Sequence, residues 1–247
     1  MKIIKENTVY QLTFLGSLFP INCYLVEELD GLTLIDAAIP SSAKGILEAA
    51  EKIGKPITRI LLTHAHDDHL GALDAIKNAL PNVPVFVSKR EARLMSSDRS
   101  LDPGEPNMPI VGGVPKKLKT RADVLLKDGD MIESLRAIAI PGHTPGSMAY
   151  LDTRNNSIIV GDAMQTKGGI AVAGVMKITF PFPAMATWNK KGAIESARKL
   201  LEYKPSLLAA GHGKMIKQPE EAIKKAILQA ENKLKNRNGG EGLCHQE

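Results

Sequence analysis

The stretch LLTHAHDDHLGAL, residues 61–73, places three histidines and two aspartates within six residues, directly after an apolar run. The chain has only six histidines, so half of them lie here. The run TRILLTH is typical of a buried strand, on which His64 and His66 point to one face, and a turn beyond it brings Asp68 and His69 toward the same place. Burying imidazoles and carboxylates together is costly unless they are paired or bind a metal. The stretch therefore predicts a site for a borderline divalent ion such as zinc.

Three further side chains with the same chemistry follow apolar strands later in the chain. His143 lies in AIAIPGHTPGS, Asp162 in SIIVGDA and His212 in SLLAAGHG. In layered α/β proteins, the edge where strands end carries functional loops on a rigid scaffold. Together with the first cluster, these positions predict one site assembled at the edge of a sheet.

Strands and helices alternate in two similar halves, near residues 1–125 and 126–247. In the first half, apolar stripes predict helices over SSAKGILEAAEKIGK and HLGALDAIKNAL. The second half repeats the strand-first order and ends with helices near residues 187–202 and 218–235. Because no linker separates the halves, we predict an α/β fold in a single domain over residues 1–247.

Two local signals stand out within this alternation. Ser88 and Glu91 have the spacing of a capping box, which predicts the start of a helix over SKREARLM. Residues 96–120 are rich in proline and glycine and follow neither the helical nor the strand period. We expect them to form a long ordered loop or lid.

Composition limits the partners and the compartment. The formal net charge is +5 and aromatic residues make up 4% of the chain, which disfavours a dedicated nucleic-acid-binding protein. No run approaches the roughly 20 apolar residues of a membrane span, and the first residues do not resemble a signal peptide, so we expect a cytoplasmic protein. Cys23 and Cys244 are expected to be free thiols, and His245 is expected to be solvated.

The motifs THAHDDHLGAL, PGHTPGS, GDA and GHG occur in this order over nearly the whole chain, and they resemble those of the metallo-β-lactamase-fold hydrolases, in particular their glyoxalase II and lactonase branch. The resemblance implies a four-layer αββα sandwich with two divalent metal ions at the sheet edge, zinc first, with iron or manganese as alternatives. It implies one ion bound by His64, His66 and His143. It implies a second ion bound by Asp68, His69 and His212, with Asp162 bridging the two. Asp67 occupies a variable position of the motif and is not expected to be a ligand.

Two aspartates have further expected roles. Two metal ions about 3.5–4 Å apart can hold a bridging water and lower its pKa from about 15.7 toward 7, which makes a hydroxide nucleophile. Asp68 is the candidate to orient that water and to pass a proton to the leaving group. Asp36 matches a family position near the site, where it orients a ligand from behind; capping of the next helix is the alternative.

The substrate class follows from what this chain lacks. Metallo-β-lactamases proper lack a bridging aspartate, and glyoxalase II enzymes add a helical domain where this chain has room for one helix and a tail. Lactonases of this fold place a tyrosine beside the metals, whereas Tyr203 is expected to pack at a helix end. We therefore predict a dinuclear zinc hydrolase, with a metal-bridging hydroxide, that acts on an ester, lactone or thioester of a small molecule.

Three alternatives remain open at this point. One is a mononuclear iron oxidoreductase of the same fold, similar to persulfide dioxygenases. Another is an acyl-homoserine lactonase as the specific hydrolase. The third is a binding protein with a structural metal, which the scarcity of cysteine disfavours.

An apolar segment, residues 165–188, could cover a partly apolar substrate. It has two adjacent glycines where it can flex and two prolines where it is stiff. The residues expected to line the pocket are Phe19, Met176, Phe180, Phe182 and Trp188. Core packing or a homodimer contact is the alternative role for each of them.

Overall fold

The computed structural model of the protein describes residues 1–240 and contains two large β-sheets, one from each half of the chain. The first sheet has its strands in chain order: β1 (Lys2–Glu6), β2 (Val9–Phe14), β3 (Ile21–Glu27), β4 (Leu32–Ile35), β5 (Ile57–Leu61), β6 (Val85–Ser88) and β7 (Val124–Leu126). Strands β4 to β7 run parallel, so their carboxyl ends meet at one edge.

The second sheet has the order β15-β14-β11-β10-β9-β8. Its strands are β8 (Met131–Ile132), β9 (Leu135–Ala139), β10 (Met148–Asp152), β11 (Ser157–Ile159), β14 (Leu207–Ala209) and β15 (Ile216–Lys217). Because β10 is antiparallel to both β9 and β11, and β11 is parallel to β14, the strands β9, β11 and β14 all end at the same edge. The short strands β12 (Met164–Gln165) and β13 (Ala171–Val172) pair separately.

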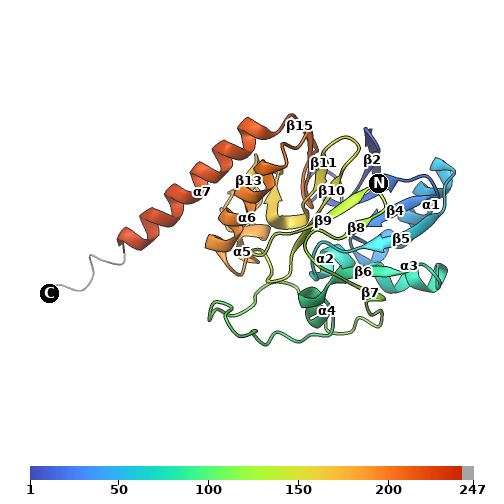
Figure 1. Cartoon of the computed structure of the whole chain (residues 1–247), viewed down its shortest axis with the longest axis horizontal. Helices are drawn as coiled ribbons and strands as arrows, with labels where there is room; N and C mark the ends of the chain where they lie inside the picture. Colours follow the sequence, from blue (N-terminus) through green and yellow to red (C-terminus); the bar gives the residue numbers. More distant parts are fainter. Residues whose placement is uncertain (241–247) are drawn as a thin grey trace.

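Helices cover the outer face of each sheet (Figure 1). The first half contains η1 (Pro40–Ser42), α1 (Ala43–Ile53), α2 (Asp67–Leu70), α3 (Leu73–Ala79) and α4 (Lys89–Met95). The second half contains η2 (Gly161–Ala163), α5 (Phe182–Met185), α6 (Lys190–Glu202) and α7 (Glu220–Gly240). In Figure 1, α1 and α3 lie on one side of the molecule and α6 and α7 on the other. This arrangement confirms the predicted α/β class and the four-layer αββα sandwich.

Three apolar clusters fill the three spaces between these layers. The first packs α1 and α3 against the outer face of the first sheet, for example Ile46 and Ile76 with Leu34. A second lies between the sheets and includes the fully buried Tyr150. The third packs α6 and α7 on the second sheet, with Leu200 among its members. Burial of this apolar surface is the main force that holds the layers together.

The structure corrects two expectations about the first motif. Strand β5 ends at Leu61, so His64 and His66 lie in the following loop and not on the strand. It ends there because the Thr63 backbone N–H donates to the Asp36 carboxylate at 2.7 Å and so leaves the ladder. The helix expected over HLGALDAIKNAL is divided into α2 and α3, because the Gly71 N–H donates to the Ala38 carbonyl at 2.7 Å.

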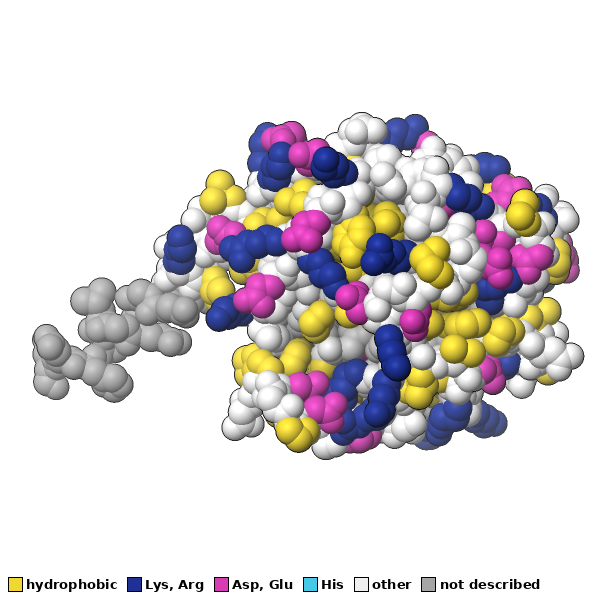
Figure 2. Space-filling view, in the orientation of Figure 1, with side chains coloured by type: hydrophobic (Ala, Val, Ile, Leu, Met, Phe, Trp, Pro, Cys, Tyr) yellow, Lys and Arg dark blue, Asp and Glu magenta, His cyan; other side chains and the backbone are white. Residues whose placement is uncertain are grey.

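Residues 96–123 form a loop without helix or strand, as expected from their composition. Both signs of charge are interspersed on the face shown in Figure 2. No helix within residues 1–240 combines the length and the apolar composition needed to cross a membrane. Cys23 is a buried free thiol, whereas Cys244 and His245 lie outside the described residues.

Candidate metal centre

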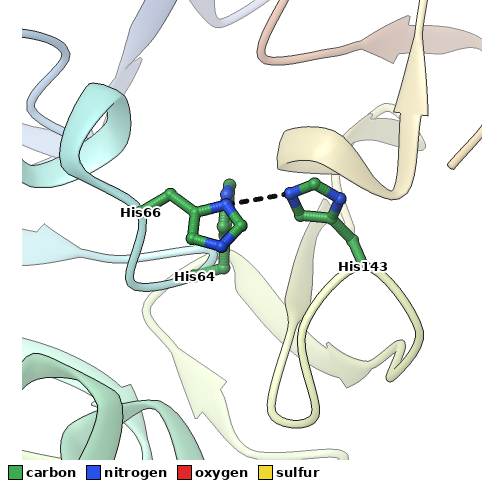
Figure 3. Close-up of side chains that lie close together, drawn as sticks. All are labelled: His64, His66 and His143. Carbon is green, nitrogen blue, oxygen red and sulfur yellow. Dashed lines mark hydrogen bonds between the residues drawn. The ribbon is translucent and has the colours of Figure 1, made fainter. Parts of the chain in front are cut away.

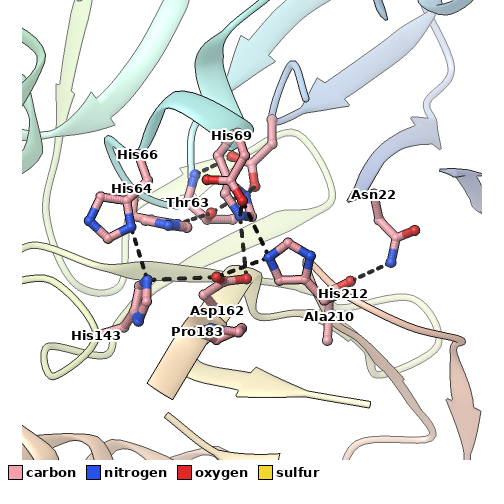
Figure 4. Close-up of polar contacts among 12 residues, drawn as sticks. Asn22, Thr63, His64, His66, His69, His143, Asp162, Pro183, Ala210 and His212 are labelled. Carbon is pink, nitrogen blue, oxygen red and sulfur yellow. Dashed lines mark hydrogen bonds and ion pairs between the residues drawn. The ribbon is translucent and has the colours of Figure 1, made fainter. Parts of the chain in front are cut away.

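The loops that follow β5, β9, β11 and β14 meet at one end of the two sheets, and they bring together the seven predicted side chains. Figure 4 labels the five histidines and Asp162. The loop after β5 carries two histidines and leads into α2, which carries Asp68 and His69. His143 lies between β9 and β10, Asp162 lies in η2 after β11, and His212 follows β14. The strands thus fix these groups through the backbone, although they are up to 148 residues apart in the chain (64 to 212).

The first group is a three-histidine cluster of His64, His66 and His143. One ring nitrogen from each lies within 4.8 Å of the others, and the rings point toward one another (Figure 3). The closest pair is His66 Nδ1 and His143 Nε2, at 3.1 Å. All three side chains are buried.

The second group is an acidic cluster of Asp68, His69 and His212. His212 Nε2 lies 3.4 Å from an Asp68 oxygen, and His69 Nε2 lies 3.9 Å from the same oxygen. Asp162 lies between the two clusters: its oxygens are 3.3 Å from His69 Nε2, 3.2 Å from His212 Nε2 and 3.7 Å from His143 Nε2. A carboxylate in this position could contact cations held by both clusters.

Backbone carbonyls fix the orientation of two of the imidazoles. His66 Nε2 lies 3.2 Å from the Val111 carbonyl, and His212 Nδ1 lies 2.8 Å from the Pro20 carbonyl. Because a carbonyl oxygen only accepts hydrogen bonds, each of these nitrogens carries the hydrogen. The other nitrogen of each ring faces the centre of the site and can bind a metal.

Side chains fix the remaining three imidazoles in the same way. The Thr187 hydroxyl donates to the Pro183 carbonyl at 2.6 Å, so it accepts from His143 Nδ1 at 3.2 Å. Asp36 orients the other two imidazoles, those of His69 and His64. It accepts directly from His69 Nδ1 at 2.8 Å. It also accepts from the Thr63 hydroxyl at 2.7 Å, and that hydroxyl in turn accepts from His64 Nδ1 at 3.0 Å.

This pattern fits a metal centre and leaves buried atoms without a protein partner. His64 Nε2, His69 Nε2 and Asp162 Oδ1 are buried and have no hydrogen bond; the last two lie 3.3 Å apart but not in hydrogen-bond geometry. An unpaired buried polar atom costs about 1–3 kcal/mol, so several of them at one point require a common partner. Imidazole nitrogens and carboxylate oxygens at this spacing suit divalent zinc, iron or manganese.

The two clusters differ in their electrostatics. Burial holds the pKa of His143 at about 3 and that of His64 well below its ordinary value. Burial also acts to lower the pKa of His212, but the charge of Asp162 and the hydrogen bonds to Asp162 and Asp68 raise it to about 10. The three-histidine cluster is therefore neutral, whereas the acidic cluster retains positive charge between its carboxylates.

Several supporting residues were not identified from the sequence. Asn22 is fully buried on β3; its side-chain N–H group donates to the Ala210 carbonyl at 2.9 Å and to the Gly213 carbonyl at 2.8 Å, on either side of His212. The sequence does hint at Asn22, because it is a polar residue within the apolar run PINCYLV. Thr187 and Val111 give no such signal, because their role depends on loops that approach from distant parts of the chain. Asp36 supports two histidines and does not cap the next helix, whose side-chain cap is absent.

Only part of the predicted apolar pocket lies at this centre. Phe19, Phe180 and Phe182 form an aromatic cluster with ring centroids 4.7–5.3 Å apart, and Phe180 lies 5.0 Å from the His212 ring. Trp188 packs in the first apolar cluster, where its backbone N–H donates to the His143 carbonyl at 3.0 Å. Met176 does not join the aromatic cluster, because it lines a separate cavity against α6 and α7.

One protein-family model matches most of the chain. The family model described as the metallo-beta-lactamase superfamily matches residues 16–212. The chain belongs to the metallo-beta-lactamase superfamily. Within it, the chain is 54% identical to the uncharacterized protein YobT of Bacillus subtilis (strain 168), over 93% of this chain and 99% of YobT. It is 30% identical to the probable metallo-hydrolase YflN of the same strain, over 78% of this chain and 80% of YflN.

Two other proteins similar to this chain carry more specific descriptions. The hydroxyacylglutathione hydrolase of Gloeobacter violaceus is 30% identical over 52% of this chain and 43% of that enzyme. The crystal structure of TTHA1623 in a di-iron-bound form superposes with a TM-score of 0.60 and 25% identity, and the match covers 86% of this chain and 96% of that one.

Proposed function

We propose that this protein is a dinuclear metal-dependent hydrolase of a small ester, lactone or thioester, with zinc as the expected metal. One observation carries the proposal. Five imidazoles and two carboxylates converge in two clusters that share Asp162. The outward nitrogen of every imidazole is already occupied by a protein acceptor. A site prepared in this way favours cations and does not need a nucleophilic serine or cysteine.

The side chains divide into two ligand sets. His64, His66 and His143 would hold one ion, and Asp68, His69 and His212 would hold the other. Asp162 would contact both ions. When bound, such a pair of ions polarises the scissile carbonyl and lowers the pKa of a water from about 15.7 toward about 7.

Asp68 is the group in the two ligand sets that reaches solvent. Its side chain is 34% exposed, whereas His69 and His212 are buried. Although burial acts to raise its pKa, the charge of His69 and the hydrogen bond from His212 hold the pKa of Asp68 at about 2, so it is a carboxylate at neutral pH. We propose that Asp68 orients the attacking water and passes its proton to the leaving group. An Asp68→Asn variant that retains its metal should lose most of its turnover; normal turnover would remove Asp68 from the chemistry.

The aromatic cluster supports a substrate with an apolar part. Phe19 and Phe182 are accessible to solvent, and both lie against the buried Phe180 next to His212. An acyl or alkyl group placed there would lie beside the acidic cluster. The similarity to a hydroxyacylglutathione hydrolase supports thioesters as one substrate class to test.

The deciding experiment is the metal content of protein purified without added metal, followed by rate assays of the same sample. The panel contains a lactone, a thioester and a phosphodiester. About two zinc ions per chain with lactone or thioester turnover supports the proposal. One iron per chain, with oxygen uptake on a persulfide and no hydrolysis, overturns it.

A further inference from the structure

Glu91, in the first turn of α4, is a fully buried carboxylate that joins the two loops of the three-histidine cluster. Its Oε2 atom accepts a hydrogen bond from the Ala65 backbone N–H at 2.7 Å, and its Oε1 atom accepts from the Gly146 N–H at 2.8 Å. Ala65 lies between His64 and His66, whereas Gly146 lies three residues after His143. A single side chain therefore spans the two loops that carry these ligands.

The same turn of α4 holds the Gly146 peptide group at a second point. The Ser88 hydroxyl donates to the Gly146 carbonyl at 2.7 Å and accepts from the Glu91 backbone N–H at 3.1 Å. A Cβ atom on Gly146 would lie 2.6 Å from Ser88 Oγ and 2.8 Å from the Glu91 nitrogen. Only glycine fits at this contact, which gives a physical reason for the glycine after Thr-Pro in PGHTPGS.

These contacts differ from the capping box that the sequence predicts. Ser88 does cap α4, as expected, but the Glu91 carboxylate does not return to the Ser88 N–H. Both of its oxygens are used by the histidine loops instead. A buried carboxylate is costly, and two backbone N–H donors from separate loops compensate for that cost only while the loops keep their spacing.

We propose that Glu91 is a positioning residue that sets the spacing of the two histidine loops and thereby the metal affinity of the three-histidine cluster. This inference rests on the proposed function, because it assumes that this cluster binds a metal ion. In Glu91→Gln the amide offers one oxygen and one NH₂ group, so one backbone N–H would face a donor and lose its acceptor. The loops would separate at that point, and one ligand set would lose its geometry while the acidic cluster kept its own.

The test compares zinc dissociation constants for both equivalents in the wild type, Glu91→Gln and Asp152→Asn, by competition with a chromophoric chelator. Asp152 is a matched control: it is also fully buried, and it accepts from Thr8 and Arg154, which are not part of the metal centre. We expect Glu91→Gln to weaken one equivalent about 10–100-fold, the range typical of groups behind metal ligands, and to leave the other within about twofold. Cobalt loaded into the weakened site should give a changed visible absorption spectrum, whereas Asp152→Asn should lower only the thermal stability.

Gly146→Ala supplies a second variant that does not depend on the folding of Glu91→Gln. It keeps the carboxylate but pushes the His143 loop away from α4, so it should cause the same selective loss. Equal affinities in the wild type and both variants, or equal losses in Glu91→Gln and Asp152→Asn, would overturn the positioning role alone. A wild-type protein that binds no metal ion would overturn the proposed function together with this inference.

Discussion

The three-histidine cluster and the acidic cluster are built from similar parts and have opposite electrostatic character. Both lie where strands end, and both use imidazoles whose outer nitrogen is bound by the fold. In the first cluster, burial lowers the pKa of His143 to about 3, and no carboxylate lies among its three members. In the second, Asp162 and Asp68 raise the pKa of His212 to about 10 against the effect of burial.

The difference shows that burial alone does not determine whether an imidazole is protonated; the neighbouring carboxylates matter as well. Neutral, buried histidines can bind a cation without releasing protons. In the acidic cluster, a metal ion must displace the proton that His212 holds between the carboxylates. The two positions should therefore differ in the pH dependence of metal binding, and the acidic cluster should gain affinity more steeply as the pH rises.

The largest expected effect comes from removing the residue that the clusters share. Asp162→Ala takes away a carboxylate that lies 3.2–3.7 Å from histidines of both clusters. We expect loss of at least one metal equivalent and a fall in kcat/KM beyond the 10–100-fold typical of groups behind the ligands. Elemental analysis and steady-state kinetics check this. Full metal occupancy with near-normal kinetics would show that the clusters do not depend on Asp162.

Two glycine substitutions should disturb the two clusters unequally. A Cβ on Gly112 would lie 2.2 Å from His66 Nε2, and a Cβ on Gly211 would lie 2.3 Å from Asp162 Oδ1 and 2.5 Å from His69 Cε1. Gly112→Ala should therefore remove the equivalent at the three-histidine cluster. Gly211→Ala should remove the equivalent at the acidic cluster and, because it also displaces the shared Asp162, weaken the other equivalent. Metal stoichiometry and cobalt spectra distinguish the two losses.

A third glycine is the matched control for Gly112→Ala. Gly104 lies in the same loop with a similar positive φ of 87°, against 97° for Gly112, but nothing lies within 4 Å of its Cβ position. Gly104→Ala should carry the backbone strain without the collision, so both metal equivalents should remain. If Gly104→Ala lost metal as Gly112→Ala does, strain in the loop and not contact with His66 would explain the effect.

The pH dependence of stability should reveal both clusters in the metal-free protein. Below the ordinary histidine pKa of 6.5, the unfolded chain binds protons that the buried His143, with a pKa of about 3, does not, so stability falls as the pH falls from 6.5 toward 3. Above 6.5 the folded state keeps the His212 proton that the unfolded chain loses, so stability falls as the pH rises toward 10.

We therefore expect the free energy of unfolding of the metal-free protein to be greatest near pH 6.5, measured by urea titration across pH 4–10. Saturating zinc should flatten the alkaline side, because the metal takes the place of the proton. A metal-free profile that rises steadily from pH 6.5 to 10 would contradict the charged state assigned to the acidic cluster.

The smallest expected effect concerns the aromatic cluster beside His212. Phe182 is 49% exposed and its ring centroid lies 4.7 Å from that of Phe19. Phe182→Ala should raise KM for an apolar acyl substrate about 3- to 10-fold, which corresponds to about 1 kcal/mol of lost apolar contact, and should leave kcat and the Tm nearly unchanged. Met185→Ala is the control, because Met185 is 66% exposed on the same helix, and it should leave KM unchanged. Equal kinetics for Phe182→Ala and the wild type would place Phe182 outside the pocket.

The sequence predicted the fold and the positions of the seven clustered side chains because residue type and location after a strand both carry information. His143, Asp162 and His212 each follow an apolar run, and parallel strands bring such positions to one edge. The predicted end of β5 was wrong, because the Asp36 carboxylate takes the Thr63 N–H, a contact between residues 27 positions apart.

Contacts that depend on the path of a loop were not predictable in this way. Val111 and Gly112 reach His66 from a segment with no periodic pattern, and Glu91 has the spacing of a cap but serves another purpose. Met176 was placed at the site because of its apolar neighbours in sequence, whereas the chain turns it toward α7. Local patterns describe burial and periodicity, and they do not describe how loops cross.

The contact between the loop of residues 96–123 and His66 limits how this loop can move. This loop gives the Val111 carbonyl to His66. It is held to the rest of the protein where the Asp67 backbone N–H donates to the Gly113 carbonyl at 2.7 Å and Trp188 Nε1 donates to the Met108 carbonyl at 3.0 Å. Swinging it open would release an imidazole with each turnover. We therefore expect the loop to act as a fixed wall of the site that does not open to admit a substrate.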